Sequence, residues 1–449
     1  MKKKQSPLVI KGVYDSHIHL LGTGLQCKTL NLFHLKSSKE LLQLNIKDSH
    51  FRGEVLFGFG WQDHLWNKTL WKDNKNTLWG EENCSYASIL DQYFTEYPVF
   101  FVSSDGHSAW LNSLALKKFS CPSLGGLLQD NLKASVQDQL PPYSEKQMSE
   151  AIIAAQNIFN TAGFTHVRDM SCDPHYWNSL LNQDSLLSLR IEQNMGAENP
   201  QHFSKALQLA ILARKERLLN IKVCGVKVYY DGSLGANTAL LQSAYLNHKK
   251  ELASPKALIE PTDLKEMLKQ SWMSNLDFSV HVIGNKASQE VLDIAEAVIK
   301  EFTQKGLPIK KLNLEHVQLL SKNSLKILAR HKNIICHLQP CHFLSDKAWL
   351  KNQLSKETLK ELFLWKDLED QKQLFYFGSD SPVEPPNIFL NNKALTEAQT
   401  WGILNVSKPW LYYHTHPDKK WVGESYTKID EENKKILEVC FNGKIIVKN

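Results

Sequence analysis

Short apolar runs rich in β-forming residues recur along the chain, and longer stretches with helical spacing separate them. Many of these runs end in a polar or ionisable residue. The eight clearest runs span residues 13–19, 164–169, 189–192, 223–231, 278–284, 312–316, 334–338 and 374–380. Helical spacing and capping residues mark 149–161, 286–302 and 323–331. Strands that alternate with helices are typical of a parallel sheet, so the pattern predicts an α/β fold, a (β/α)₈ TIM-like barrel.

One connection is far longer than a barrel needs. About 145 residues separate His19, at the end of the first predicted strand, from Phe164 at the start of the second. This stretch has its own strand-like runs at 55–61 and 98–102, and it holds Trp61, Trp66, Trp71, Trp79 and Trp110. We predict an insertion after strand 1, about residues 25–148, that folds over the barrel mouth, where loops carry specificity. An independent small domain is the alternative.

Composition and charge narrow the class of protein. Apolar residues make up 42% of the 449 residues, and 53 Lys plus Arg against 47 Asp plus Glu give a net charge of +6. That excess is too small and too scattered to indicate nucleic acid or a membrane surface. The eight cysteines form no CxxC pair, and no apolar run approaches the ~20 residues of a membrane span. We expect a cytoplasmic enzyme with reduced cysteines and a small-molecule substrate, and leave a homo-oligomer open.

Histidines and an aspartate stand where such a barrel carries chemistry. His17 and His19 are two apart on one strand, so both imidazoles leave the same face. A lone pair of this kind is weak evidence, because buried histidine pairs occur by chance. His281, His316 and Asp380 stand at or near the ends of later strands, and these ends converge in a barrel. Imidazole and carboxylate ligands suit Zn²⁺ and related ions, and five of them predict two metals if a further group bridges the ions.

Lys227 is the candidate bridge. It lies inside the apolar run 223–231, where a bare ammonium is costly to bury. A lysine can escape that cost by a lowered pKa, and the neutral amine can react with CO₂ to give a carbamate with two oxygens for two metals. The alternative interpretation is a snorkelling lysine or one paired with Asp231.

The ordered motifs of the chain resemble the amidohydrolase superfamily, and within it amidohydrolase family 3, which includes N-substituted formamide deformylases. The matching segments are 15–20 (DSHIHL), 58–61 with Leu65 and Trp66, 105–113 (DGHSAWLNS), Lys227 with 231–235 (DGSLG), 281–284 (HVIG), 315–318 (EHVQ), 339–340 (QP) and 378–383 (GSDSPV). They run in family order over a barrel from about residue 12 to 390. The resemblance implies a metal-dependent hydrolase.

The resemblance also implies roles for individual residues. His17, His19 and Asp380 would bind the more buried of two Zn²⁺ ions, and His281 and His316 the second. A carboxylated Lys227 would bridge the ions, and Asp380 would be the catalytic proton carrier. Trp61, Asp105 and His107 of the insertion are candidate substrate-binding residues, with packing as the alternative for Trp61 and His107.

Two features depart from the family pattern. Asn285 stands where the family usually has Asp, which alters a contact behind the ligands. Only 16 residues precede His17, whereas family members typically carry several dozen that build part of a β-sandwich. The segment 436–447 has an Asn442-Gly443 turn between two apolar runs and resembles the closing hairpin of that sandwich. We therefore expect a reduced β-sandwich from residues 1–11 and 420–449.

These expectations lead to one preferred reaction and three rivals. A divalent ion lowers the pKa of bound water from 15.7 towards about 7, and the resulting hydroxide would attack a carbonyl. We predict hydrolysis of an amide or another carbon–nitrogen bond of a small molecule. A mononuclear deaminase is disfavoured because no Glu follows closely after His281. An esterase or lactonase would use the same ligands, and a non-catalytic metal-binding relative is the rival from another class.

Overall fold

The structure is a computed structural model that describes residues 6–27, 29–62, 66, 84–104, 106–121, 125–246 and 255–449. It divides into two compact units. The first comprises Met1–Leu21 and Ile152–Asn449, and the second comprises Gly22–Ala151. No helix among the described residues is long and apolar enough to cross a bilayer.

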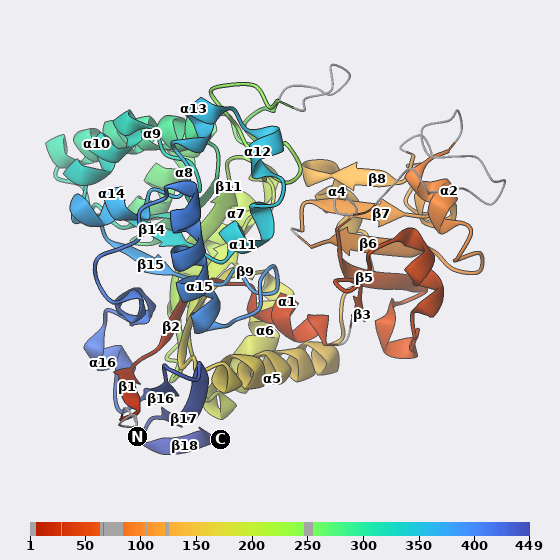
Figure 1. Cartoon of the computed structure of the whole chain (residues 1–449), viewed down its shortest axis with the longest axis horizontal. Coiled ribbons are helices and arrows are strands. Elements are labelled where there is room, and N and C mark those ends of the chain that lie inside the picture. Colours follow the sequence, from red (N-terminus) through yellow and green to blue (C-terminus); the bar gives the residue numbers. More distant parts are fainter. Residues whose placement is uncertain are drawn as a thin grey trace. The chain divides into compact units, whose positions relative to one another are not determined.

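The first unit is built around a barrel of eight parallel strands (Figure 1), which confirms the predicted fold. In chain order the strands are β2 (Tyr14–Ile18), β9 (His166–Cys172), β10 (Arg190–Gly196), β11 (Ile221–Tyr229), β12 (Asp277–Val282), β13 (Leu312–His316), β14 (Ile334–Leu338) and β15 (Phe375–Phe377). A parallel bridge between Ile18 and Ser381 closes the sheet. Two backbone bonds hold this seam: His19 N–H donates to Ser381 O at 2.8 Å, and Asp380 N–H donates to His17 O at 2.8 Å.

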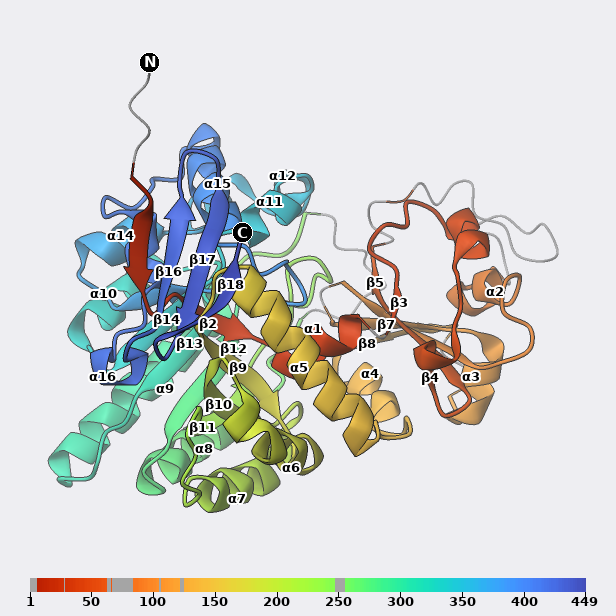
Figure 2. The same ribbon diagram turned by 90° about the horizontal axis from the view of Figure 1, so that it is seen from below.

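Helices follow the strands and lie outside them, as Figure 2 shows for α7, α8 and α9. The three predicted helices are present as α5 (Glu145–Thr161), α9 (Asn285–Gln304) and α10 (Lys322–Arg330). Helix α9 illustrates the cause, since its buried residues include Val291, Leu292 and Ala295, which recur at helical spacing. The remaining helices of this unit are α6 (Pro174–Gln183), α7 (Phe203–Ala213), α8 (Pro261–Met273), α11 (His342–Asp346), α12 (Leu350–Gln353), α13 (Lys356–Leu359), α14 (Trp365–Asp370), α15 (Ile388–Ala398) and α16 (Lys419–Val422).

A small antiparallel sheet joins the two ends of the chain, as expected for a reduced sandwich. Its strands, in spatial order, are β1 (Leu8–Lys11), β16 (Tyr426–Asp430), β17 (Lys435–Phe441) and β18 (Lys444–Lys448). The predicted hairpin lies between β17 and β18. Asn442 and Gly443 both have positive φ, 46° and 80°, which is what a two-residue hairpin turn requires.

The second unit has its own mixed sheet. Its strands are β3 (Leu30–Asn31), β4 (Phe51–Arg52), β5 (Val55–Trp61), β6 (Val99–Ser103), β7 (Ser108–Leu111) and β8 (Leu127–Gln129), accompanied by α2 (Tyr86–Leu90), α3 (Ser113–Lys118) and α4 (Asp130–Gln137). Both strand-like runs predicted here are present, as β5 and β6. Trp61, Trp66 and Trp110 are buried in one apolar core. Trp71 and Trp79 lie outside the described residues. Helices α1 (Leu20–Gln26) and α5 carry the chain between the units.

Candidate metal centre

The two histidines at the end of β2 reach one carboxylate. His17 Nε2 lies 3.3 Å and His19 Nε2 lies 3.2 Å from Oδ1 of Asp380. The alternation of a strand places both imidazoles on the inner face, as their spacing predicted. Asp380 follows β15, the strand across the seam from β2. Its backbone N–H is bonded to His17 O, and this bond holds Asp380 beside the two histidines.

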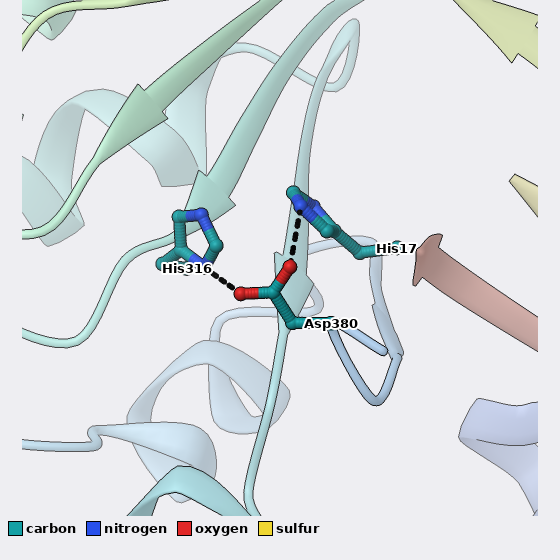
Figure 3. Close-up of side chains that lie close together, drawn as sticks. All are labelled: His17, His316 and Asp380. Carbon is teal, nitrogen blue, oxygen red and sulfur yellow. Dashed lines mark ion pairs between the residues drawn. The ribbon is translucent and has the colours of Figure 1, made fainter. Parts of the chain in front are cut away.

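Two further histidines complete the group. His316 ends β13 and His281 lies on the neighbouring β12, and their ring centroids are 4.4 Å apart. His316 Nδ1 is 3.8 Å from Asp380 Oδ2, and its ring centroid is 4.7 Å from that of His17. Figure 3 shows His17 and His316 on either side of the Asp380 carboxylate. One ligand atom from each of these three buried residues lies within 4.8 Å of the others, a spacing that could hold one ion.

The backbone bends sharply where two of these residues sit. His316 has φ of 74° and Asp380 has φ of 60°. Histidine and aspartate adopt left-handed backbone more readily than most residues, and at both positions it takes the chain out of the extended conformation. At His316 the bend coincides with the end of β13, and Asp380 lies just beyond the end of β15.

Lys227 is fully buried in β11, and its Nζ has no hydrogen-bond partner among the described residues. The Tyr229 ring lies beside it, with its centroid 4.3 Å from Nζ. Burial lowers the pKa of Lys227 to about 8, although Glu315 and Asp380 act in the opposite direction. Asp231, the alternative partner, instead accepts the backbone N–H groups of Ile283 and Gly284. An unsatisfied buried amine of this kind fits a lysine that carries a further group.

A buried ionic chain supports His17 from behind. Glu315 Oε2 lies 2.6 Å from His17 Nδ1, and Arg168 donates to Glu315 Oε1 at 2.8 Å. Arg168 also donates to Ser279 Oγ at 2.6 Å. Burial alone would raise the pKa of Glu315, but Arg168 and the nearby histidines hold it well below its usual range. The ionised carboxylate therefore keeps the proton of His17 on Nδ1 and leaves Nε2 free to act as a ligand.

Charge also sets the state of Asp380. Burial would raise its pKa, but His17, His19 and His316 hold the pKa well below its usual range. The pKa of His316 is itself lowered, first by burial and then by His281 and His17. Imidazole nitrogens beside an ionised carboxylate are the donor set that divalent metals such as zinc prefer. The residues present therefore fit a metal centre.

Several residues at the centre had no role assigned from sequence. Besides Arg168, they are Gln339, whose Oε1 lies 2.9 Å from His316 Nδ1, and His342, whose Nε2 lies 3.7 Å from Asp380 Oδ2. Gln339 follows the predicted strand 334–338 directly, whereas His342 lies further along the connection. The rule that chemistry sits at strand ends could have found Gln339.

Asn285, the departure from the family pattern, has a structural contact. Its Oδ1 accepts the backbone N–H of Gln242 at 2.9 Å, and its Nδ2 donates to Glu361 Oε2 at 2.6 Å. An aspartate here would face the Glu361 carboxylate with a like charge, so the amide suits this chain.

The candidate substrate-binding residues of the insertion belong to the second unit. Trp61 is 3% exposed in the core of the second unit, and its indole N–H donates to Phe101 O at 2.8 Å. These contacts favour the packing alternative for Trp61. His107 lies in the connection between β6 and β7 and is partly buried. Asp105 lies outside the described residues. Substrate binding by these three residues stays a prediction.

Comparison with known proteins agrees with this geometry. A model of the amidohydrolase family matches residues 8–415. Protein LONG AFTER FAR-RED 3 of Arabidopsis thaliana is 28% identical over 417 residues, which are 85% of this chain and 67% of that protein. The putative amidohydrolase YtcJ of Bacillus subtilis is 25% identical over 406 residues, 84% of this chain and 71% of the relative.

Solved structures show the same fold. An uncharacterized metal-dependent hydrolase from Pyrococcus furiosus is 24% identical, with a TM-score of 0.65 over 87% of this chain and 77% of its own. Another, from Pyrococcus horikoshii, is also 24% identical, with a TM-score of 0.66 over 93% of this chain and 78% of its own.

Proposed function

This chain belongs to the amidohydrolase family, and from that premise we propose that it hydrolyses an amide or another carbon–nitrogen bond of a small molecule. Family membership supports a metal-dependent hydrolase. The observation that carries the proposal is the buried set His17, His316 and Asp380, whose ligand atoms lie within 4.8 Å of one another at the carboxyl end of the barrel. That end is where barrels of this type place their chemistry.

The same residues would hold the metal. His17, His19 and Asp380 form one ligand group, and His281 and His316 form a second beside it. Lys227 would join the groups after its neutral amine adds CO₂, releases a proton and becomes an anionic carbamate. A buried Nζ without a hydrogen-bond partner among the described residues supports this assignment. A bound divalent ion supplies a lowered pKa for water and polarises the substrate carbonyl.

We assign the proton transfer to Asp380. Its carboxylate is ionised, because the neighbouring histidines hold its pKa low, and its two oxygens face His19 of its own ligand group and His316 of the second group. In hydrolysis a water oxygen bonds to the carbonyl carbon, and Asp380 accepts a proton from that water. It then delivers the proton to the leaving nitrogen as the carbon–nitrogen bond breaks. The Arg168–Glu315 pair keeps His17 in one tautomer and orientation throughout.

The rivals differ in what they require of the chain. A mononuclear deaminase would use an acidic residue shortly after His281, whereas position 285 holds an asparagine that is bonded to Gln242 and Glu361. An esterase or lactonase would use the same ligands, and only the leaving atom distinguishes it. We favour the amide substrate because the motifs of the chain resemble the formamide-hydrolysing members of the family.

A matched pair of substrates tests the leaving atom. Zinc-loaded protein would be assayed on N-benzylformamide and N-benzylacetamide, and in parallel on benzyl formate and benzyl acetate. We expect benzylamine release that a chelator abolishes and added zinc restores. Cleavage of the esters alone would contradict the proposal in favour of an esterase. Ammonia release from cytosine without amide cleavage would favour the deaminase.

A further inference from the structure

His342 occupies a place at the metal centre that the preceding roles leave unused. It begins α11, directly after β14, and is 8% exposed. Its Nε2 lies 3.7 Å from Asp380 Oδ2, and its ring is nearly parallel to that of His316, at 18° with centroids 6.1 Å apart. The imidazole therefore points at the same carboxylate as the candidate ligands.

The other ring nitrogen shows which tautomer is present. Gln318 Nε2 lies 3.3 Å from His342 Nδ1 and also 3.5 Å from Asp346 Oδ2. A carboxylate only accepts hydrogen bonds, so the nitrogen of the Gln318 amide must be the atom on this side. An amide nitrogen only donates, so Nδ1 of His342 accepts and carries no proton. The neutral ring then carries its proton on Nε2, the nitrogen that faces the centre.

This donor has nothing to bind in the protein. Among the described residues, His342 Nε2 has no hydrogen-bond partner, and 3.7 Å to Asp380 is too long for one. A nitrogen that carries a proton is not a metal ligand, and His342 is not part of the compact ligand set. Buried donors are normally satisfied. The geometry therefore indicates that this N–H meets an acceptor on a molecule that enters the centre.

We propose that His342 is a further catalytic residue, which donates its Nε2–H to the substrate carbonyl oxygen as that oxygen becomes negative. The inference rests on the proposed amide hydrolysis. A carbonyl oxygen is the natural acceptor of an amide, and its negative charge grows as the water oxygen adds to the carbon. A fixed donor at that point binds the transition state more strongly than the substrate, so it raises kcat more than it lowers KM. Gln318 is the positioning residue that fixes the tautomer.

The first test reads the tautomer without any metal or substrate. Ring ¹⁵N spectra of metal-free protein, compared between wild type and His342→Gln, identify the signals of His342. We expect a neutral ring with the proton on Nε2. A proton on Nδ1, or a charged ring at neutral pH, would overturn the inference whether or not the enzyme cleaves amides.

The second test uses variants that distinguish the loss of the N–H donor from a change in the bulk of the side chain. His342→Gln can still present an N–H near the Nε2 position, whereas His342→Leu cannot. With N-benzylformamide we expect His342→Leu to lower kcat about 10²-fold with little change in KM, and His342→Gln to lose much less. Gln318→Glu, which turns the donor at Nδ1 into an acceptor, should resemble His342→Leu. His331→Gln, outside the centre and bonded to Glu296, is the matched control.

The third test does not depend on turnover. Methylphosphonate, whose oxygens imitate the charged oxygen of the transition state, would be titrated into metal-loaded protein by calorimetry. We expect His342→Leu to weaken binding about tenfold and His342→Gln to stay close to wild type, with unchanged metal content in both. Equal binding in all variants, no binding to wild type, or loss of metal in His342→Leu would overturn the inference. If wild type binds the phosphonate as expected but cleaves no amide, the proposed function alone fails.

Discussion

At the scale of single residues, the centre depends on buried charges that hold one another in place. Asp380 would be costly to bury ionised, yet His17 and His19 lie 3.3 and 3.2 Å from its Oδ1. Glu315 is paired in the same way between His17 and Arg168. Each carboxylate therefore stays ionised and keeps its neighbouring imidazole in one orientation, which is the state that a metal ligand and a proton acceptor require.

Replacing Asp380 tests its part in proton transfer. In Asp380→Asn the amide keeps the shape of the side chain but cannot carry a proton, so we expect kcat to fall by at least about 10²-fold. The circular dichroism spectrum should stay close to that of wild type. Asp418→Asn is the control, because Asp418 caps α16 through Lys420 N–H and Trp421 N–H and asparagine caps equally well. Retained activity in Asp380→Asn would remove it as the proton carrier.

Most of this centre could be predicted from the sequence, because the ends of apolar strands can be recognised in it. His17, His19, His281, His316 and Asp380 each stand at or near the end of an apolar run, and the structure brings them together. His342 was missed because it follows Pro340 in a connection with no period to place it. Its partnership with Gln318 depends on how two loops fold, which no local pattern encodes. The insertion candidates are harder still to assign from sequence. Trp61 is of a residue type that often binds ligands, but its indole N–H is bonded within the core of the second unit.

At the scale of elements, the barrel seam decides where Asp380 lies. Strand β15 covers Phe375–Phe377, shorter than the predicted 374–380, because Asp380 has left the extended conformation. Gly378 is needed beside it, since a Cβ there would lie 2.7 Å from His17 N. Asn391 of α15 supports the same turn: its Oδ1 accepts Cys341 N–H at 2.9 Å, and its Nδ2 lies 3.3 Å from Gly378 O and 3.1 Å from His414 Nε2.

His414 makes this support sensitive to acid. Its Nδ1 lies 3.2 Å from Tyr14 O and its Nε2 faces the Asn391 amide nitrogen, so both ring nitrogens are in use in the neutral form. Burial lowers the pKa of His414 to about 4. The unfolded chain takes up this proton near pH 6.5, so the contribution to stability is complete above pH 6.5 and is lost as pH falls towards 4. At pH 5 the loss is about 2 kcal/mol.

Urea denaturation of metal-free protein at pH 7 and pH 5 measures this contribution. We expect the fall in the free energy of unfolding between the two pH values to be about 2 kcal/mol smaller in His414→Gln than in wild type. An equal fall in both proteins would show that His414 is not held neutral. Both proteins are measured without metal, so that the titration of the metal ligands contributes equally to wild type and to the variant.

At the level of the whole molecule, the candidate metal ligands all belong to the first unit, and the tryptophan-rich core belongs to the second. The family match spans both units, from residue 8 to residue 415. That the insertion folds over the barrel mouth stays a prediction from its position in the chain. The apolar runs of the sequence identified the eight barrel strands but only β5 and β6 of the second sheet, and the period of a strand carries no information on how two units meet.

Removal of the metal should therefore destabilise the first unit and leave the second unchanged. A bound ion stabilises only the part of the fold that holds it. We expect a chelator to increase hydrogen exchange in peptides covering β13 and β15, and zinc to reverse the increase. Peptides covering β5, β6 and β7 should exchange at the same rate in both states. A similar increase in both units, or none in the barrel, would contradict this assignment of the ligands.

The proposed bridged centre is tested most directly by the metal content per chain of protein produced with zinc and bicarbonate, compared between wild type and Lys227→Ala. We expect about two ions per chain in wild type and fewer in the variant, because a carbamate that joins the two ligand groups would be lost. The Asp418→Asn control should keep the wild-type content. One ion per chain, unaffected by Lys227→Ala, would contradict the bridged centre and favour a mononuclear enzyme. No bound metal in wild type would contradict the metal-dependent hydrolase itself.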